Sequence, residues 1–501
     1  MRTVGEVLRS RASDDHTFLV CDDERLTYRD ACRESRRLAK GLVASGAGRG
    51  THVGLLMPNG ADFALAALAA ARIGAVAVPM STMSTAAELH TLIDGSDTEI
   101  LLAFPSYRSK DFGAVLREAA ALGAPVLRQV HLTGGDAWDG LLNGSVSDDL
   151  FRAIEEDVAP SDDLVIVHTS GSTSAPKGVV HTHGALLDHL RVLNGMRALT
   201  RDEVLFSNSP FFWIGGFAYT LLGTLLAGAT LACSRAAEPS RVLDVIERER
   251  PTMVNGYASS VAALAADPSF AGRDLTSIRR GNLYPIMPKS ALPADPGLRT
   301  NMLGTTEGGS VVLTDRDDAD DLPEDGRGSF GRPVPGYEAR IVDRETGADG
   351  PAGELWLRGP ALMRGYYGVE RFDAFDADGW FHTGDLARTD EAGRWYFLGR
   401  GDDLVKTAGA GVSPAEVQDA IRTATGLDSY VFGLPDAERG QVVAAVLVTD
   451  GRPPPLRETL AALLSPYKIP REVRAVPVSR VPLRSSGKVD MNALAELFDD
   501  R

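Results

Sequence analysis

The chain has 501 residues, which is too long for one hydrophobic core, so two or three domains are expected. Hydrophobic residues make up 44% and charged residues 24%, as in an ordinary globular protein. The formal net charge is −16, and Lys and Arg form no dense run, which argues against nucleic acid as a partner. Small anionic substrates are not excluded, because a few local cations can outweigh the overall charge.

The cysteines and the apolar segments indicate a reducing, aqueous environment. The three Cys lack the spacing of a metal or redox motif, so we expect reduced thiols and a cytoplasmic location. Residues 1–15 contain no apolar core like that of a signal peptide. The most apolar segments, 64–71 and 215–229, are short or broken by Gly, so no membrane span is expected.

Strands and helices alternate in the first part of the chain. Residues 51–57 and 74–79 predict strands, and the Ala-rich segment 61–72 between them predicts a helix. Because this helix is apolar almost all round, we expect it to be buried between layers. Further strands are predicted at 98–103 and 125–132, which indicates an α/β fold with a parallel sheet covered on both faces.

The alternation continues in the second part. After a short apolar strand at 163–167, the predicted elements are helices at 184–198, 216–227 and 240–249 and strands at 203–208, 229–233 and 252–255. Ligands of open α/β sheets bind at the carboxyl ends of the strands. The loop 168–178 and the block LGTTE at Leu303–Glu307 both follow predicted strands, so we expect them to meet in one crevice.

The last part changes character twice. Between 326 and 400, short strands alternate with Gly, Pro and Asp turns, which predicts a small β-barrel-like subdomain. Beyond Arg400 the pattern is α+β, and Ser413–Glu416 (SPAE) predicts the start of a helix. We expect a mobile C-terminal domain at 401–501 and an N-terminal domain made of the subdomains 1–160, 161–325 and 326–400.

The stretch His168–His183 (HTSGSTSAPKGVVHTH) is rich in Ser, Thr and Gly and carries one Lys. Its first part cannot build a core, but its amides, hydroxyls and ammonium can converge on phosphate oxygens; a plain exposed turn is the alternative. The common P-loop needs a Gly directly before its Lys and a Ser or Thr directly after it, and this stretch has neither. His181 and His183 are expected to cap or pack a helix, since no third metal ligand is suggested nearby.

This stretch resembles the phosphate loop of the acyl-adenylate-forming superfamily, which includes acyl-CoA ligases, peptide-synthetase adenylation domains and luciferases. Four further blocks resemble the family in the expected order: LGTTE at Leu303–Glu307, GWFHTGD at Gly379–Asp385, GRGDDLVKTAGAGVSP at Gly399–Pro414 and SSGKVD at Ser485–Asp490. The resemblance implies a two-domain α/β enzyme that uses ATP, Mg²⁺ and coenzyme A. It would form an acyl adenylate and then pass the acyl group to a thiol.

The resemblance also implies roles for residues at the phosphates. Thr306 would touch the α-phosphate, and Glu307 would bind Mg²⁺. Leu303 stands where most relatives stack an aromatic side chain on adenine. The β- and γ-phosphates would be held by Thr169, Ser170, Gly171, Ser172, Thr173 and Lys177.

The later blocks imply a ribose site and a moving lid. Asp385 would accept both ribose hydroxyls and Arg400 would help to hold ribose or phosphate, with a plain salt bridge between them as the alternative. Lys488 would bridge the substrate carboxylate and the α-phosphate, a brief electrostatic task that suits an ammonium on a long stem. For the thiol step the C-terminal domain would turn about Asp402 and bring pantetheine close to Gly409 and Gly411, which have no Cβ.

The block PFFWIGGF at Pro210–Phe217 bears on the acid. Relatives that activate amino acids usually show an Asp there, whereas nothing in this block can neutralise an ammonium group. An aliphatic, alicyclic or aromatic acid is therefore favoured. Candidate pocket residues, some of which can equally be core residues, are Phe212, Trp213, Gly216, Phe217 and Tyr284.

The predicted function is an ATP-dependent acid–CoA ligase. Three alternatives stay open: an enzyme that loads a carrier protein, an enzyme that only thioesterifies a supplied acyl adenylate, and a nucleotide-binding relic without activity. The second is suggested by Leu303 and Ser174, which depart from the family pattern. The identity of the acid and the oligomeric state, a homodimer included, stay open as well.

Overall fold

The computed structural model describes residues 2–123, 125–169, 176–257, 261–316, 321–401, 403–407, 410–436, 440–461, 463–464, 468–484 and 487–499. The chain forms two compact units. Unit 1 comprises Met1–Glu338 and Arg358–Gly379, and unit 2 comprises Ala339–Leu357 and Trp380–Arg501. The domain and subdomain limits expected from the sequence stay predictions.

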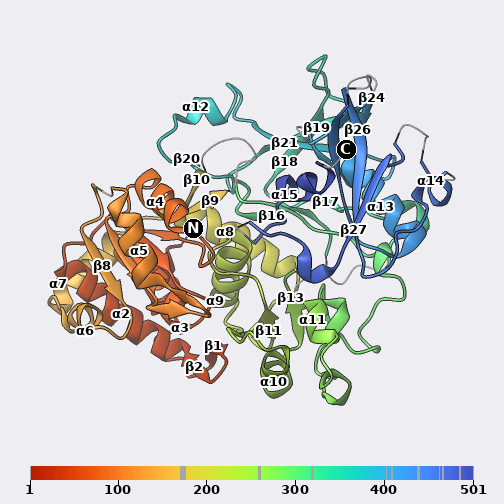
Figure 1. Cartoon of the computed structure of the whole chain (residues 1–501). Helices are drawn as coiled ribbons and strands as arrows, with labels where there is room; N and C mark the ends of the chain where they lie inside the picture. Colours follow the sequence, from red (N-terminus) through yellow and green to blue (C-terminus); the bar gives the residue numbers. More distant parts are fainter. Residues whose placement is uncertain are drawn as a thin grey trace. The chain divides into compact units, whose positions relative to one another are not determined.

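Unit 1 contains a seven-stranded sheet in the order β20-β10-β9-β4-β3-β5-β8. Its parallel strands are β3 (His52–Leu56), β4 (Val76–Pro79), β5 (Ile100–Ala103), β8 (Gln129–Leu132) and β9 (Asp163–Thr169). The strands β10 (Lys177–Thr182) and β20 (Gly365–Tyr366) extend it in antiparallel pairs, side by side with β9 in Figure 1.

A second, six-stranded sheet in unit 1 has the order β14-β13-β11-β12-β1-β2. Its parallel strands are β1 (Thr17–Cys21), β11 (Val204–Ser207), β12 (Thr230–Cys233), β13 (Met253–Asn255) and β14 (Arg280–Gly281). The edge strand β2 (Glu24–Thr27) is antiparallel. A small third sheet is built from β15 (Leu303–Thr305), β16 (Ser310–Thr314) and β17 (Arg332–Pro333).

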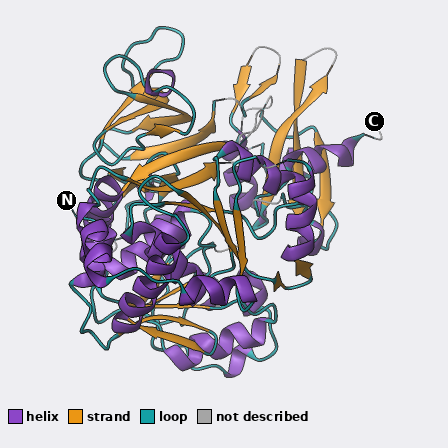
Figure 2. Ribbon diagram, turned by 90° about the vertical axis from the view of Figure 1, so that its left-hand side faces the viewer, coloured by secondary structure: helices purple, strands orange, loops and turns teal. Residues whose placement is uncertain are grey.

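Helices separate and cover the two large sheets (Figure 2). The Ala-rich helix α3 (Ala61–Arg72) contacts strands of both sheets and is buried over most of its length, as its sequence predicts. The outer faces are covered by α4 (Ala86–Gly95) and α5 (Phe112–Ala121) on one sheet and by α10 (Pro239–Glu249) and α11 (Ala262–Ala265) on the other. The predicted α/β fold is therefore confirmed.

The remaining helices of unit 1 pack around this frame. They are α1 (Val4–Arg9), α2 (Tyr28–Ala44), α6 (Asp136–Asn143), α7 (Asp148–Asp157), α8 (His183–Met196), α9 (Gly223–Ala227) and α12 (Arg371–Ala374). The helix predicted at 216–227 is present, but its first part, Gly215–Leu222, is a π-helix. A Cβ on Gly216 would lie 1.9 Å from the carbonyl oxygen of Pro210, so this helix can approach that loop only with Gly there.

Unit 2 contains two sheets. The first has four antiparallel strands, β18 (Glu338–Val342), β19 (Ala352–Arg358), β21 (Phe381–Thr389) and β22 (Trp395–Arg400). The second is built from β23 (Val405–Thr407), β24 (Ala410–Val412), β25 (Ser429–Asp436), β26 (Gly440–Val448) and β27 (Glu472–Val476). Its helices are α13 (Pro414–Thr425), α14 (Leu456–Thr459) and α15 (Met491–Ala495).

The helix start predicted at Ser413 is confirmed, because Ser413 Oγ accepts a hydrogen bond from the Glu416 amide. The helix α14 is a single short turn that ends at Thr459. Within the described ranges, no helix is long and apolar enough to cross a bilayer.

A buried ion pair ties α7 to α3. Arg72 Nε lies 2.5 Å from Glu155 Oε1, and the two side chains are only 2% and 4% exposed. The other carboxylate oxygen of Glu155 is 2.8 Å from Arg9 Nη1. Removing one partner of such a pair leaves an uncompensated buried charge.

We therefore predict that Glu155→Gln lowers the free energy of unfolding by about 3 kcal/mol in urea unfolding followed by circular dichroism. Asp149→Asn on the same helix is the control. Its partner Arg152 is 3.7 Å away and both side chains are exposed, so its unfolding midpoint should stay unchanged. Equal midpoints for both variants would contradict this account of the pair.

Three buried histidines make stability depend on pH. Burial lowers the pKa values of His181, His183 and His189 from 6.5 to about 4, so the folded state holds them neutral. The unfolded chain takes up these protons below about pH 6.5, and the stabilisation present above that pH is lost as pH falls toward 4.

At pH 5 the loss should be about 2 kcal/mol for each histidine. We expect the thermal midpoint to fall steadily between pH 7 and 5, and His189→Gln to flatten that slope. A slope that His189→Gln leaves unchanged would contradict the assignment.

Candidate functional site

The ends of the Ser/Thr/Gly loop lie side by side in unit 1. Thr169 ends β9 and Lys177 begins β10, and the two residues are paired across the hairpin. Thr169 Oγ1 lies 3.5 Å from the carbonyl oxygen of Lys177. The Lys177 side chain is exposed at the mouth of this hairpin. The predicted phosphate contacts Ser170, Gly171, Ser172 and Thr173 lie outside the described residues.

Thr306 and Glu307 lie in the turn between β15 and β16, and three successive carbonyl groups of that turn are held from outside it. His181 Nε2 donates to the Thr306 oxygen at 2.7 Å. The Met363 amide donates to the backbone carbonyl oxygen of Glu307 at 2.8 Å, and Tyr337 Oη donates to the backbone carbonyl oxygen of Gly308 at 2.7 Å. Because each carbonyl has a partner from another element, the turn that carries Thr306 and Glu307 is fixed.

Complete burial lowers the pKa of His181 to about 4, so the ring is neutral. Because the Thr306 carbonyl oxygen can only accept, the single ring hydrogen sits on Nε2. His183, also buried, accepts a hydrogen bond from the Val4 amide through Nδ1 at 3.2 Å. Both histidines pack within unit 1, and the described part of the chain holds no group of three His, Cys, Asp or Glu placed to bind a metal.

Lys177 and Glu307 contact the same side chain, that of Tyr366. The ammonium of Lys177 lies 4.9 Å from the centroid of the Tyr366 ring. The hydroxyl of Tyr366 donates to Glu307 Oε1 at 2.8 Å. The structure thus brings together the two charged groups that the sequence assigned to the phosphates and the metal. Nothing in the sequence distinguishes Tyr366 from the neighbouring Tyr367, so sequence reasoning missed this contact.

Leu303, at the start of β15, is 9% exposed and largely buried. Among the aromatic candidates, Trp213 makes edge-to-face contacts with Phe212 and with Tyr257, at ring-centroid distances of 5.8 and 4.8 Å. Phe217 is buried and contacts Phe63, with the two ring centroids 6.4 Å apart.

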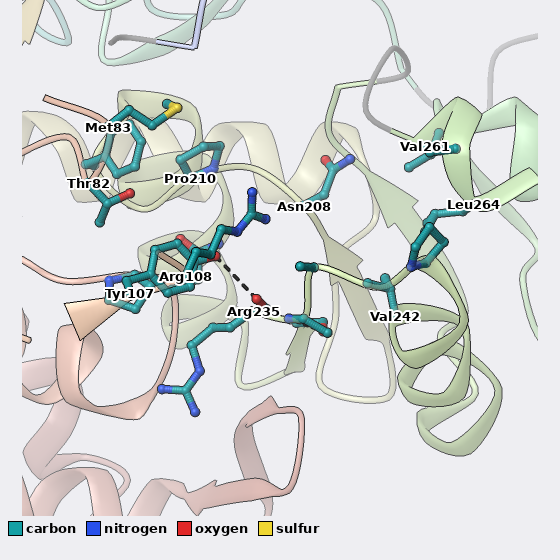
Figure 3. Close-up of a pocket in the computed structure, with 18 of the residues that line it drawn as sticks. Thr82, Met83, Tyr107, Arg108, Asn208, Pro210, Arg235, Val242, Val261 and Leu264 are labelled. Atoms are coloured by element: carbon teal, nitrogen blue, oxygen red, sulfur yellow. Dashed lines mark hydrogen bonds between the residues drawn. The ribbon is translucent and has the colours of Figure 1, made fainter. Parts of the chain in front are cut away.

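Unit 1 contains a cavity of about 550 Å³ near the carboxyl ends of β11 and β12. Figure 3 shows Thr82, Asn208, Arg108 and Arg235 around it, with the apolar residues Val242, Val261 and Leu264 on one side and Pro210 near Met83 on the other. Phe212 is the predicted acyl-pocket residue that lines it. Trp213, Gly216, Phe217 and Tyr284 do not.

Arg235 and Arg108 differ in their partners at this cavity. Arg235 pairs with Glu24 at 2.6 Å, and its backbone oxygen accepts from the Tyr107 hydroxyl at 3.3 Å. Arg108 is exposed at the tip of the hairpin β6 (Ser106–Tyr107) and β7 (Lys110–Asp111), where its guanidinium lies 5.3 Å from the Tyr107 ring centroid.

The remaining candidates belong to unit 2. Asp385 on β21 is opposite Arg400 on β22, with Arg400 Nε 3.3 Å from Asp385 Oδ1, so the salt bridge foreseen as an alternative is present. Asp385 is buried, whereas Arg400 is exposed. The side chain of Lys488 is exposed. Gly411 lies on β24, and Asp402 and Gly409 lie outside the described residues.

Comparison with known proteins identifies the chain's relatives. Residues 8–367 match the AMP-binding enzyme family, and residues 418–488 match the AMP-binding enzyme C-terminal domain. A feruloyl-CoA synthase of Amycolatopsis sp is 31% identical over 501 residues, covering 96% of each chain. The 3-[(3aS,4S,7aS)-7a-methyl-1,5-dioxo-octahydro-1H-inden-4-yl]propanoyl:CoA ligase of Mycobacterium tuberculosis is 31% identical over 521 residues, covering 99% of each.

Solved structures agree with these matches. ATP-bound MatB from Rhodopseudomonas palustris superposes with a TM-score of 0.83 at 26% identity, covering 100% of this chain and 99% of its own. The anthranilate CoA ligase AuaEII, solved with anthranoyl-AMP, shares the fold with a TM-score of 0.85 at 23% identity, covering 99% of this chain and 97% of its own. The chain therefore belongs to the AMP-binding enzyme family, and it is an ATP-dependent, AMP-forming acid–CoA ligase that works through an acyl adenylate.

Proposed function

We propose that this ligase activates an apolar carboxylic acid, with Lys177 and the Thr306–Glu307 turn holding the phosphates of magnesium-bound ATP. The main support is the contact of Lys177 and Glu307 with one tyrosine ring, because it places a cation and a carboxylate beside the hairpin mouth. Attack of a carboxylate on the α-phosphate brings two anions together, so positioned cations and dipoles contribute most of the catalysis.

The residues present fit a magnesium ion shared with the nucleotide. Mg²⁺ prefers carboxylate and phosphate oxygens and is usually bound through one or two carboxylates plus substrate phosphates. Glu307 offers a partly exposed carboxylate, and only its Oε1 is bonded within the described residues. When bound, the ion would neutralise charge on the phosphates, while Lys177 would hold the departing pyrophosphate.

The cavity near β11 and β12 supports an apolar acid. At about 550 Å³ it is large enough for a ring system, and none of the described residues that line it is Asp or Glu. An amino acid would bring an ammonium group that finds no counter-charge there. The named relatives act on a ferulic acid and on a bicyclic propanoic acid, which are acids of the same character.

Unit 2 would serve the two half-reactions in turn. In the first, Lys488 would bridge the substrate carboxylate and the α-phosphate, and Asp385 and Arg400 would hold the ribose. In the second, rotation about Asp402 would withdraw Lys488 and bring the hairpin with Gly409 and Gly411 to the thiol.

Coenzyme A is the acceptor that the relatives' names support. A carrier protein as a further acceptor, a homodimer and a cytoplasmic location are also proposals. Adding a carrier protein in place of coenzyme A to the enzyme-bound acyl adenylate tests the further acceptor, because only an acceptor discharges AMP.

We predict that Lys488→Ala slows adenylation at least a hundredfold but leaves thioester formation from added acyl adenylate within a few fold. Acid-dependent pyrophosphate exchange measures the first step, and coenzyme A consumption measures the second. Lys468→Ala is the control, because Lys468 is a lysine of the same unit that pairs with Glu416 at 2.6 Å. Equal damage to both steps would contradict the role of Lys488.

We also predict that Ala263→Trp, which fills part of the cavity, shifts preference toward smaller acids by at least tenfold in kcat/KM. AMP release is measured for a series of aromatic and alicyclic acids of increasing size. Ala262→Trp, on the same helix but outside the cavity lining, is the matched control, since both alanines are exposed. An unchanged size profile would place the acid elsewhere.

A further inference from the structure

Tyr366 is held in place by its neighbours in the chain. Its strand β20 pairs with β10, with Tyr366 opposite Val179. The amide of Arg364 donates to the Val180 oxygen at 2.8 Å, and the amide of Tyr367 donates to the Gly178 oxygen at 2.7 Å. The backbone is therefore fixed on both sides of Tyr366, against the strand that begins with Lys177.

The segment that carries Tyr366 also makes two hydrogen bonds to Glu307. The Met363 amide bonds the Glu307 carbonyl oxygen, and the Tyr366 hydroxyl bonds the Glu307 carboxylate. One short segment thus fixes both the backbone and the side chain of the same residue. A glutamate side chain has several rotatable bonds, and a hydrogen bond to one oxygen selects one of its orientations.

This orientation leaves the second carboxylate oxygen, Oε2, without a hydrogen bond or ion pair in the described structure. Mg²⁺ needs nearly ideal geometry, so a ligand that is already oriented spares the cost of ordering it on binding. Hydrogen bonds to a coordinating carboxylate contribute to metal affinity in this way.

The ring of Tyr366 has a second effect, on Lys177. An ammonium near a carboxylate tends to form an ion pair. Such a pair between Lys177 and Glu307 would turn the two groups toward each other and away from the phosphates and the metal. Here the ammonium of Lys177 lies by the ring, and no ion pair joins it to Glu307 within the described part of the chain. The aromatic contact attracts the cation without occupying the carboxylate.

We propose that Tyr366 is a positioning residue for the adenylation step, which orients Glu307 toward a nucleotide-bound divalent cation and keeps Lys177 from pairing with it. The proposal rests on the assignment of Glu307 to the metal made under the proposed function.

The test is calorimetric binding of ATP without acid, so that no reaction proceeds, in Mg²⁺ and separately in EDTA. Tyr366→Phe keeps the ring and removes the hydroxyl. It should raise the Kd of ATP about tenfold in Mg²⁺ and less than twofold in EDTA. The Mg²⁺ concentration for half-maximal AMP formation should rise by a similar factor.

Tyr367→Phe is the matched control. Tyr367 is the next residue, and its hydroxyl also donates to a carboxylate, that of Asp97 at 2.7 Å. This variant should bind ATP like the unmodified enzyme under both conditions. If Tyr366→Phe weakens binding equally with and without Mg²⁺, or not at all, the proposal is wrong.

The variant Glu307→Gln tests the assignment of Glu307 to the metal separately from the role proposed for Tyr366. If it loses Mg²⁺-dependent binding while Tyr366→Phe does not, only the role of Tyr366 is overturned. If Glu307→Gln itself leaves the Mg²⁺ dependence of ATP binding unchanged, the assignment of Glu307 to the metal is wrong. The positioning role of Tyr366 is then wrong as well.

Discussion

The pairing of β20 with β10 is the constraint on which the proposed phosphate site depends. It adds two residues from late in unit 1 to the edge of a sheet whose other strands all lie between His52 and Thr182. Through this pairing the hairpin that carries Lys177 comes into contact with Tyr366, and Tyr366 in turn contacts Glu307. Three segments that are distant in sequence are thereby held at one place.

The rigidity of this arrangement comes from groups that never need to touch the substrate. Neutral His181 and buried Tyr337 hold carbonyl groups of the turn that carries Thr306 and Glu307. A charged imidazole could not be kept in that buried position, so the depressed pKa of His181 and its structural role have the same cause. Adenylation is a reaction between anions, and its rate depends on dipoles and cations that are already oriented when the substrates arrive.

Much of the fold could be predicted from the sequence because its signals are local. The Ala-rich helix α3, with no polar face, had to be buried, and Ser413 and Pro414 marked a helix start by their own chemistry. The partner of a two-residue strand such as β20 depends on the whole fold. The π-helical geometry at Gly215–Leu222, where Gly216 lies against the carbonyl oxygen of Pro210 in the loop just before the helix, is likewise not reported by a helical periodicity.

Some residues of the candidate site could likewise be predicted from the sequence, and others could not. Ordered motifs pointed to Lys177, Thr306 and Glu307, whereas Tyr366 belongs to no quoted motif and becomes visible only through its contacts. The cavity is similar, because most of its lining comes from segments without motifs, and one of the five expected pocket residues, Phe212, lines it. An aromatic side chain next to a motif can pack in the hydrophobic core or contact a ligand, and the sequence alone does not distinguish the two roles.

We propose that the nucleotide binds in unit 1 between the Lys177 hairpin and the Glu307 turn. A crystal structure with Mg²⁺ and a non-reactive ATP analogue tests it most directly. We predict phosphate oxygens at Lys177 and a metal about 2.0–2.1 Å from a carboxylate oxygen of Glu307. A nucleotide bound elsewhere, with Lys177 and Glu307 both facing solvent, would contradict the account.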